Sequence, residues 1–317
     1  MLILFNKEYI LSSCSISIQP TVSVIIPTYN RSSTILRAIN SVINQTYKDF
    51  EIIVVDDASQ DNTEEIIRNI TDERVHYIKH AFNKGANAAR NTGIRQARGK
   101  YIAFQDSDDE WLDDKLQQQL SIFDNIDNVG AVHTGYIRHE NGVKEYLPKG
   151  ELNITDGMLH TLLLYGNFIS TQTLVVCSEH LYAINGFDEN LPRLQDWELV
   201  LRLSKLCKFV FINKPLVNVY FNPGCITSKP EKRIIAMKYI LEKHSTDFTN
   251  HPLSLAEHTY NIGNDYLSLN NRKLAISYFC RAFKISRKPK YALGIFLLFF
   301  GIKTFNAIKR YSKLIRN

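Results

Sequence analysis

Short apolar runs alternate with amphipathic stretches along the N-terminal third of the chain. Four runs rich in β-branched and aromatic residues predict buried strands at 21–26, 51–55, 75–78 and 101–104. Between these runs, apolar residues recur at helical spacing, which predicts helices at 35–43, 64–70 and 86–98. Strands and helices that alternate in this way are typical of a parallel sheet with right-handed crossovers. The pattern therefore predicts an α/β fold.

The pattern becomes less regular in the middle of the chain. Asn141-Gly142 lies between two apolar segments, and this dipeptide is a strong signal for a β-hairpin. Further strands are expected at 131–138, 143–147, 173–177, 208–212 and 216–221, with helices after Trp111 and from Leu194. From about Glu231 the pattern is helical. We expect a leader over 1–20, an α/β domain over 21–225 and an all-helical extension over 226–317.

Polar residues follow three of the predicted parallel strands, at 28–31, 56–57 and 106–109. In open α/β sheets, ligands bind outside the carboxyl ends of the strands. Solvated turns would account for the three clusters only one at a time, whereas a nucleotide site accounts for all three together. The arrangement therefore favours a nucleotide site at this edge of the sheet.

Asp106 and Asp108 follow the fourth strand and lie on the same side of an extended chain. Two carboxylates on one side repel each other unless a cation lies between them, and a hard divalent ion such as Mg²⁺ or Mn²⁺ takes oxygen ligands of this kind. Asp109 points to the opposite side by the same alternation. The alternative is a solvated acidic turn that caps the next helix.

Composition and charge narrow the class of protein. The 317 residues are 44% hydrophobic and carry a net charge of +6. The basic excess is concentrated between Lys284 and Arg316, a stretch without acidic residues, which points to an anionic surface rather than to nucleic acid. The five cysteines form no C-x-x-C pair, and we expect no histidine to cluster with them. We therefore expect neither a zinc site nor a disulfide framework, but reduced thiols in the cytoplasm.

Four segments in order resemble the successive motifs of family 2 glycosyltransferases, which are inverting enzymes with the GT-A fold. They are Val22-Ser-Val-Ile-Ile-Pro-Thr-Tyr-Asn-Arg31, Ile53-Val-Val-Asp-Asp-Ala-Ser59, Asn83-Lys-Gly-Ala-Asn-Ala-Ala-Arg-Asn-Thr-Gly93 and Phe104-Gln-Asp-Ser-Asp-Asp109. The resemblance covers roughly residues 20–225. It implies a mixed, mostly parallel sheet flanked by helices.

The resemblance also implies how the donor is bound. Pro27, Thr28 and Tyr29 would flank the nucleotide base, and Asp57 would accept a hydrogen bond from the uracil imide N–H. Asp57 could instead be a turn residue or a helix cap.

Two further elements of the donor site follow from the same resemblance. Arg90 would lie near the diphosphate or steady the acidic cluster, unless it is a surface arginine of its helix. Asp106 and Asp108 resemble the D-x-D motif of the family, with Asp108 as the firmer metal ligand and Asp106 shared between ribose and metal.

The segment Leu194-Gln-Asp-Trp-Glu-Leu resembles the Glu-Asp-x-x-Leu motif of the same family, with Gln195 in place of the usual glutamate. The resemblance makes Asp196 the general base. The alternative is a capping or first-turn acid stabilised by the helix dipole. A helix N-terminus would lower the pKa of Asp196 and keep it ionised. The chain lacks the Gln/Arg-x-x-Arg-Trp segment of processive synthases, which favours transfer of one sugar per encounter.

The C-terminal extension carries two signals. Ile262-Gly263, Ala275, Phe279 and Pro289 resemble one tetratricopeptide-type helix pair, which cannot bury its own face and should dock on the catalytic domain or on another protein. Residues 291–302 contain no charge and are followed by basic residues. They are too short to span a bilayer, so they predict either an interfacial helix on an anionic membrane or a core helix of the extension.

We therefore predict a metal-dependent inverting glycosyltransferase that moves a sugar from a nucleotide sugar, most simply a UDP-sugar, to a glycan or lipid-linked acceptor. The expected setting is surface polysaccharide assembly in the cytoplasm, with peripheral contact at the inner face of the membrane and no role for nucleic acid. Two alternatives stay open. A nucleotidyltransferase is disfavoured because 27–31 has no glycine, and a non-catalytic scaffold is disfavoured by the retained Asp57, Asp106, Asp108 and Asp196.

Overall fold

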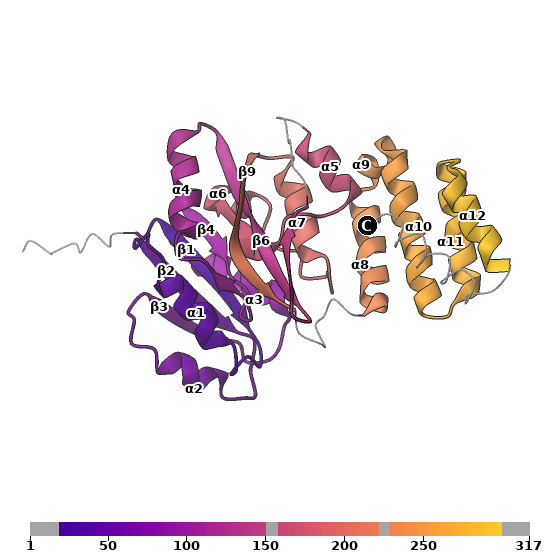
Figure 1. The fold of residues 1–317 in the computed structure, drawn as a ribbon. Coiled ribbons are helices and arrows are strands. Elements are labelled where there is room, and N and C mark those ends of the chain that lie inside the picture. The colour runs from indigo at the N-terminus through magenta and orange to yellow at the C-terminus, as the bar shows by residue number, and fades with distance from the viewer. Residues whose placement is uncertain (1–18, 150–157, 222–228, 300–317) are drawn as a thin grey trace, which may run out of the picture.

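The computed structural model describes residues 19–149, 158–221 and 229–299. Within these residues one nine-stranded sheet has the order β3-β2-β1-β4-β8-β6-β9-β5, with β7 paired to β6. Helices flank the sheet, and a row of C-terminal helices extends from one end of the molecule (Figure 1). The α/β fold with a helical C-terminal region is confirmed.

The first half of the sheet is parallel, as the sequence predicts. Its strands are β1 (Val22–Thr28), β2 (Phe50–Asp56), β3 (Val75–Lys79) and β4 (Tyr101–Phe104), and the crossover helices are α1 (Ile35–Ile43), α2 (Thr63–Arg68) and α3 (Ala86–Gln96). Thr28 of β1 lies opposite Asp56 of β2, so the strand ends meet at one edge. Strand β1 continues through Pro27, where we expected it to stop. Proline is tolerated there because pairing with β4 ends at Ile25.

The second half of the sheet is largely antiparallel. It contains β5 (Glu110–Trp111), β6 (Val129–Glu140), β7 (Val143–Leu147), β8 (Leu174–Cys177) and β9 (Lys208–Tyr220). The β6–β7 hairpin turns at Asn141 and Gly142, whose φ angles of 50° and 79° are left-handed, as the dipeptide predicts. Strand β9 is one continuous strand rather than two, because register shifts against β6 absorb its irregular part.

Helices fill the space around this half. They are α4 (Lys115–Asn125), α5 (Leu159–Tyr165), α6 (Ser178–Ala183), α7 (Gln195–Leu203) and the 3₁₀ turn η1 (Thr171–Thr173). The C-terminal helices are α8 (Pro230–Lys243), α9 (Ser245–Asn250), α10 (Pro252–Ser268), α11 (Arg272–Ile285) and α12 (Pro289–Phe299). The predicted helix pair corresponds to α10 and α11, which approach so closely that a side-chain carbon at Gly263 would lie 2.5 Å from the ring of Phe279.

The C-terminal helices share the core of the α/β region. One buried cluster joins Ile25 and Phe104 of the sheet to Trp197 of α7 and to Ile240 and Phe248 of α8 and α9. The row of helices therefore docks on the rest of the chain through a continuous apolar interior.

Helix α12 has two faces. Tyr291 and Leu298 are fully buried, whereas the side chains of Leu293 and Phe296 are more than half exposed. Among the described residues, no helix is both long enough and apolar enough to span a bilayer. The leader (1–18) and the basic segment after residue 299 lie outside the described residues.

We expect Phe248→Ala to lower the free energy of unfolding of the whole protein by about 3–5 kcal/mol, because Phe248 is fully buried against Trp197. Urea unfolding followed by fluorescence and circular dichroism should give one shifted transition. The control Phe82→Ala removes a ring that is 65% exposed and should change stability by less than about 0.5 kcal/mol. A separate early transition confined to the C-terminal helices would contradict the shared core.

Candidate active site

Two loops close against each other at the carboxyl edge of the parallel strands. The Asn30 N–H donates to Ser59 Oγ at 2.9 Å, and the Gln60 N–H donates to Asn30 Oδ1 at 2.8 Å. Pro27 and Thr28 are buried at the base of these loops, and Thr28 Oγ1 has no hydrogen-bond partner among the described residues. Tyr29 is 42% exposed at the top. The three residues expected beside the base follow one another at the end of β1, and this segment is called here the wall at 27–29. The hydroxyl of Thr28 within it is buried and unsatisfied.

Asp57 is buried beside this wall and holds the next loop in place. Its Oδ1 pairs with His80 Nδ1 and accepts the Lys84 N–H, both at 2.8 Å, and its Oδ2 accepts the Gly85 N–H at 2.7 Å. Gly85 has φ of 94°, a left-handed conformation that glycine adopts without strain. Because Oδ2 accepts only one of these bonds, it keeps capacity for a further donor. Asp57 is therefore a loop anchor whatever else it binds.

Buried Arg90 of α3 and partly exposed Asp106 form an ion pair at the end of β4. Arg90 is 5% exposed and its Nη2 lies 2.7 Å from Asp106 Oδ1. Its guanidinium carbon lies 5.3 Å from the centre of the Phe187 ring. Its Nε and Nη1 are buried with no hydrogen-bond partner among the described residues. Arg90 is thus a buried residue that stabilises the acidic cluster. Two of its nitrogen donors, Nε and Nη1, remain without an acceptor among the described residues.

Asp108 and Asp109 add negative charge beside this pair. Burial, and then the charge of Asp106, raise the pKa of Asp108, whose Oδ2 lies 3.5 Å from Arg31 Nη2. Burial, Asp106 and Asp108 raise the pKa of Asp109. Arg31 and Arg37 lower the pKa of Asp108 and Arg90 pairs with Asp106, but burial and the charge of Asp106 still raise the pKa of Asp108. A cation nearby would favour its ionised form.

Asp109 contacts β9 and η1, but strand alternation is not the reason, because 106–109 is a turn in which the Asp109 N–H donates to the Asp106 carbonyl at 3.1 Å rather than an extended chain. It is 3% exposed, accepts the Tyr220 N–H at 2.9 Å and accepts a bond from Gln172 Nε2 at 2.8 Å. These bonds tie the end of β4 to β9 and to η1. Asp109 therefore holds the acidic loop against β9 and η1.

Asp196 lies in the first turn of α7. Its Oδ1 accepts the Trp197 N–H at 2.8 Å, and its Oδ2 accepts a bond from Asn167 Nδ2 at 2.9 Å. The residue before the helix, Leu194, has φ of 63°, which is a strained conformation for leucine. The helix start is thus fixed by its surroundings rather than by a side-chain cap.

The pKa of Asp196 depends on charged residues of α3 and of the acidic cluster after β4. Burial raises the pKa of Asp196; the Trp197 N–H and the charge of Arg90 lower it, and the charge of Asp106 raises it. The expectation that the helix N-terminus would lower this pKa is wrong, because desolvation outweighs the helix dipole. Since Arg90 and Asp106 both act on Asp196, the end of β4, helix α3 and helix α7 meet in one electrostatic cluster.

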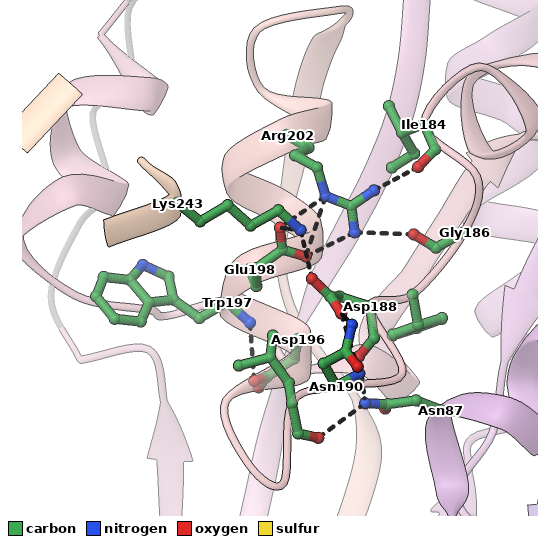
Figure 2. Close-up of polar contacts among 12 residues, drawn as sticks. Asn87, Ile184, Gly186, Asp188, Asn190, Asp196, Trp197, Glu198, Arg202 and Lys243 are labelled. Atoms are coloured by element: carbon green, nitrogen blue, oxygen red, sulfur yellow. Dashed lines mark hydrogen bonds and ion pairs between the residues drawn. The ribbon is translucent and has the colours of Figure 1, made fainter. Parts of the chain in front are cut away.

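A buried charge network lies directly behind Asp196 (Figure 2). Glu198 of α7 is fully buried, and its carboxylate lies 2.6 Å from Arg202 Nη2, 2.8 Å from Lys243 Nζ and 3.3 Å from His244 Nε2. Lys243 Nζ also lies 2.5 Å from Asp188 Oδ2. One lysine of α8 thus joins helix α7 to the segment 186–191.

The same segment is joined to α3, the helix that carries Arg90. Asn87 Nδ2 donates to the carbonyls of Asp188 and Leu191 at 2.9 and 3.1 Å. Asn91 accepts the Phe187 N–H at 2.8 Å and donates to the Phe187 carbonyl at 2.9 Å. Helices α3, α7 and α8 are therefore held as one unit through this short segment.

Trp197, next to Asp196, anchors α7 from the other side. Its Nε1 donates to the Leu163 carbonyl at 2.7 Å, and its ring lies 4.9 Å from that of His258 on α10. His258 Nε2 in turn lies 2.7 Å from the Leu164 carbonyl of α5. The position of Asp196 thus depends on helices α5 and α10 as well as on α8.

One expectation about the cysteines is wrong. Cys177, Glu179 and His180 offer ligand atoms that all lie within 4.8 Å of one another. The sequence contains the spacing Cys177-x-x-His180, which pairs a cysteine with a histidine and so is not a C-x-x-C motif. This cluster lies at the opposite edge of the sheet, because Cys177 pairs with Tyr101 at the start of β4.

Known proteins resemble this chain in sequence and in fold. Residues 23–181 match the family model described as glycosyl transferase family 2. The chain is 33% identical over 209 residues to the amylovoran biosynthesis glycosyltransferase AmsB of Erwinia amylovora, covering 62% of this chain and 69% of AmsB. It is 32% identical over 225 residues to the UDP-Glc:alpha-D-GlcNAc-diphosphoundecaprenol beta-1,3-glucosyltransferase WfaP of Escherichia coli, covering 70% of this chain and 85% of WfaP.

A solved structure extends the likeness to nearly the whole chain. S. aureus TarS in complex with UDP-GlcNAc aligns with a TM-score of 0.66 at 18% identity, over 93% of this chain and 92% of that one. At this identity the likeness concerns the fold. It includes the C-terminal helices as well as the sheet, since the alignment covers more than the α/β region.

The network behind Asp196 predicts a pH-dependent contribution to stability. Burial by itself would raise the pKa of Glu198, but bonds from His244 and Arg202 hold it at about 2. A depressed pKa stabilises the fold above the unfolded value near 4.5, and this contribution is lost as the pH falls toward 2. Glu198→Gln should therefore lower the free energy of unfolding by roughly 3 kcal/mol at pH 7, and by much less near pH 3.

Urea unfolding at the two pH values measures this difference. The control Glu65→Gln changes an exposed residue of α2 and should leave stability unchanged at both. Equal stability of Glu198→Gln and the unsubstituted protein at pH 7 would show that the network contributes nothing.

Proposed function

Because this chain belongs to glycosyltransferase family 2, we propose that it transfers one sugar from a UDP-sugar to an acceptor hydroxyl with inversion at the anomeric carbon. The observation that carries the proposal is the meeting of Arg90, Asp106 and Asp196 in one electrostatic cluster at the strand ends. WfaP is named for a UDP-Glc donor, and TarS was solved in complex with UDP-GlcNAc. They support a donor of this class.

The wall at 27–29 and the groups around it suit such a donor. Pro27 and Tyr29 would flank the base, and Asp57 Oδ2 would accept the uracil imide N–H. Thr28 Oγ1 and the two unpartnered nitrogens of Arg90 are buried donors without acceptors. Leaving them unsatisfied costs free energy, so oxygen atoms of a bound ribose or diphosphate are the natural partners.

The acidic cluster suits a hard divalent cation. The raised pKa of Asp108 and its distance of 3.5 Å from Arg31 show that its charge is only partly compensated. Asp108, with Asp106, would hold Mg²⁺ or Mn²⁺ through carboxylate oxygens. When bound, such an ion neutralises charge on the departing diphosphate.

Asp196 would remove the proton from the acceptor hydroxyl as that oxygen attacks the anomeric carbon on the face opposite the diphosphate. Asn167 and the Trp197 N–H fix the orientation of its carboxylate. Its raised pKa makes its carboxylate a stronger base than that of an exposed aspartate. Gln195, which replaces an acid of the family motif, spares Asp196 a neighbouring negative charge.

The acceptor would be a glycan or a lipid-linked sugar in surface polysaccharide assembly. The name of WfaP specifies a diphosphoundecaprenol-linked acceptor, and that of AmsB specifies amylovoran biosynthesis. The exposed Leu293 and Phe296 of α12 would contact the cytoplasmic face of the membrane, together with the basic residues that follow. The pair α10–α11, which resembles a tetratricopeptide-type unit, would fix α12 relative to the site.

We expect Asp196→Asn to reduce transfer by about 10²–10⁴-fold while UDP binding is retained, because general-base catalysis has this magnitude. Product formation and isothermal titration measure the two quantities. The activity of the unsubstituted protein should fall on the acid side as Asp196 is protonated, with an apparent pKa above 3.8. The control Asp113→Asn changes an exposed carboxylate and should leave both quantities unchanged. Normal turnover of Asp196→Asn would remove it from this role.

The same substitution should raise thermal stability at neutral pH. A raised pKa means that the folded state disfavours the ionised form, so the group destabilises the fold increasingly as the pH rises above the unfolded value of 3.8, and fully once the pH exceeds the folded pKa. Asparagine removes that charge, and its advantage should vanish below about pH 3.8, where both states are protonated. Melting temperatures across this range provide the measurement, and a destabilised variant at pH 7 would contradict the assigned burial effect.

Asp108→Ala should abolish the increase in UDP affinity that Mn²⁺ produces, because the main carboxylate ligand is lost. Isothermal titration of UDP with and without Mn²⁺ tests this directly. Binding in the absence of metal should persist, since Arg90 and the wall at 27–29 are untouched. Unchanged metal-dependent affinity in Asp108→Ala would place the ion elsewhere.

A further inference from the structure

The edge of the sheet opposite the candidate active site carries a second cluster of ligand-type side chains. Ala131 of β6 pairs with Val176 of β8, and Val129 of β6 pairs with the first residue of β9. Gly130 therefore lies between Cys177, which ends β8, and Cys207, which precedes β9. Cysteines that are distant in sequence are thus brought to one point by strand register.

His180 completes this arrangement from helix α6. Ligand atoms of Cys177, Glu179 and His180 all lie within 4.8 Å of one another. The side chain of His180 is 22% exposed and that of Glu179 is 79% exposed. The thiol and the imidazole are therefore largely enclosed, while the carboxylate reaches solvent and leaves a route of entry.

Gly130 shows how closely the second thiol approaches. A side-chain carbon at this position would lie 2.3 Å from Cys207 Cβ and 2.6 Å from His180 Nε2. The side chains of Cys207 and His180 therefore both pack against the Cα atom of Gly130, and no residue larger than glycine fits at this position. Burial raises the pKa of Cys207 to about 12, and the neighbouring thiol of Cys177 contributes to the shift.

We propose that Cys177, Cys207, His180 and Glu179 bind one Zn²⁺ ion. Zinc takes four ligands in a tetrahedron, with sulfur at about 2.3 Å and nitrogen at about 2.0 Å, so its ligand atoms are separated by roughly 3.3–3.8 Å. The ligand atoms of Cys177, Glu179 and His180, within 4.8 Å of one another, would reach that spacing by side-chain rotations. Cys207 lies outside that group of three, and its thiol would join them by rotating about the Cα–Cβ bond, since its Cβ lies beside Gly130 together with the His180 ring. Two thiolates and an imidazole select zinc over the magnesium or manganese that suits carboxylates.

The surroundings are compatible with such an ion. The charge of Lys100 lowers the pKa of Cys177, whereas burial and Glu179 raise it. A bound ion displaces the thiol protons, which is the usual consequence of zinc coordination. The ion would tie the end of β8 and the start of α6 to the start of β9. Its role would be structural, since the site lies away from Asp106 and Asp196.

Cobalt substitution tests the proposal with the full-length protein. One equivalent of Co²⁺ should produce thiolate-to-cobalt charge-transfer absorption and the visible bands of a tetrahedral ion, and one equivalent of Zn²⁺ should abolish them. Cys177→Ser and His180→Gln should each weaken Co²⁺ binding by at least about tenfold. The matched control Cys280→Ser, on α11, should retain the full signal, as should Asp108→Ala.

Three results would overturn the site. The first is the absence of charge-transfer absorption at one equivalent of Co²⁺ in freshly reduced protein. The second is a signal that persists in Cys177→Ser or His180→Gln, where circular dichroism shows the variant to be folded. If the cysteine variant does not fold, His180→Gln decides the outcome, since its ring lies partly at the surface. The third is a Cys177–Cys207 disulfide found by non-reducing peptide mapping of protein purified without reductant, which would assign the thiols to a redox bridge instead.

Discussion

Negative charge gathered at one edge of the sheet is the constraint on which the candidate site depends. Asp106, Asp108 and Asp109 follow a single short strand; besides burial, the charge of Asp106 raises the pKa of Asp108, and the charges of Asp106 and Asp108 raise the pKa of Asp109. Arg90 compensates part of this charge from inside the protein, at 2.7 Å from Asp106. A bound cation would stabilise the ionised form of these carboxylates, which is the reason that a cation is proposed at this cluster.

Contacts among helix α3, helix α7, helix α8 and the segment 186–191 fix the positions of the charged residues of the site. Helix α3 carries Arg90 and helix α7 carries Asp196, and both are attached through the segment 186–191 to Lys243 of α8 (Figure 2). Trp197 adds a second attachment through α10. The C-terminal helices thus contribute to the geometry of the site as well as to the core. The match to the family model ends at residue 181, so it includes the residues proposed to bind the donor and stops before Asp196.

Sequence reasoning was strongest where local pattern and chemistry agree. The boundaries of β4 follow from the apolar run 101–104, and the placement of the acidic residues at its carboxyl end follows from the parallel order of the strands. The alternation argument for Asp106, Asp108 and Asp109 does not hold, because 106–109 is a turn. It failed where the outcome depends on distant partners. The pKa of Asp196 is set by burial from segments far along the chain, not by its own helix. The Glu198–Lys243 contact and the approach of Cys207 to His180 likewise depend on tertiary packing, which spacing along the chain does not encode.

The most direct test of the central claim is a crystal structure with UDP and Mn²⁺, recorded with anomalous scattering at the manganese absorption edge. The expected result is one strong anomalous peak in contact with Asp108, a diphosphate beside Arg90, and Asp196 facing the open side of the nucleotide. A manganese peak remote from Asp108, or a nucleotide bound away from the strand ends of β1, β2 and β4, would contradict it.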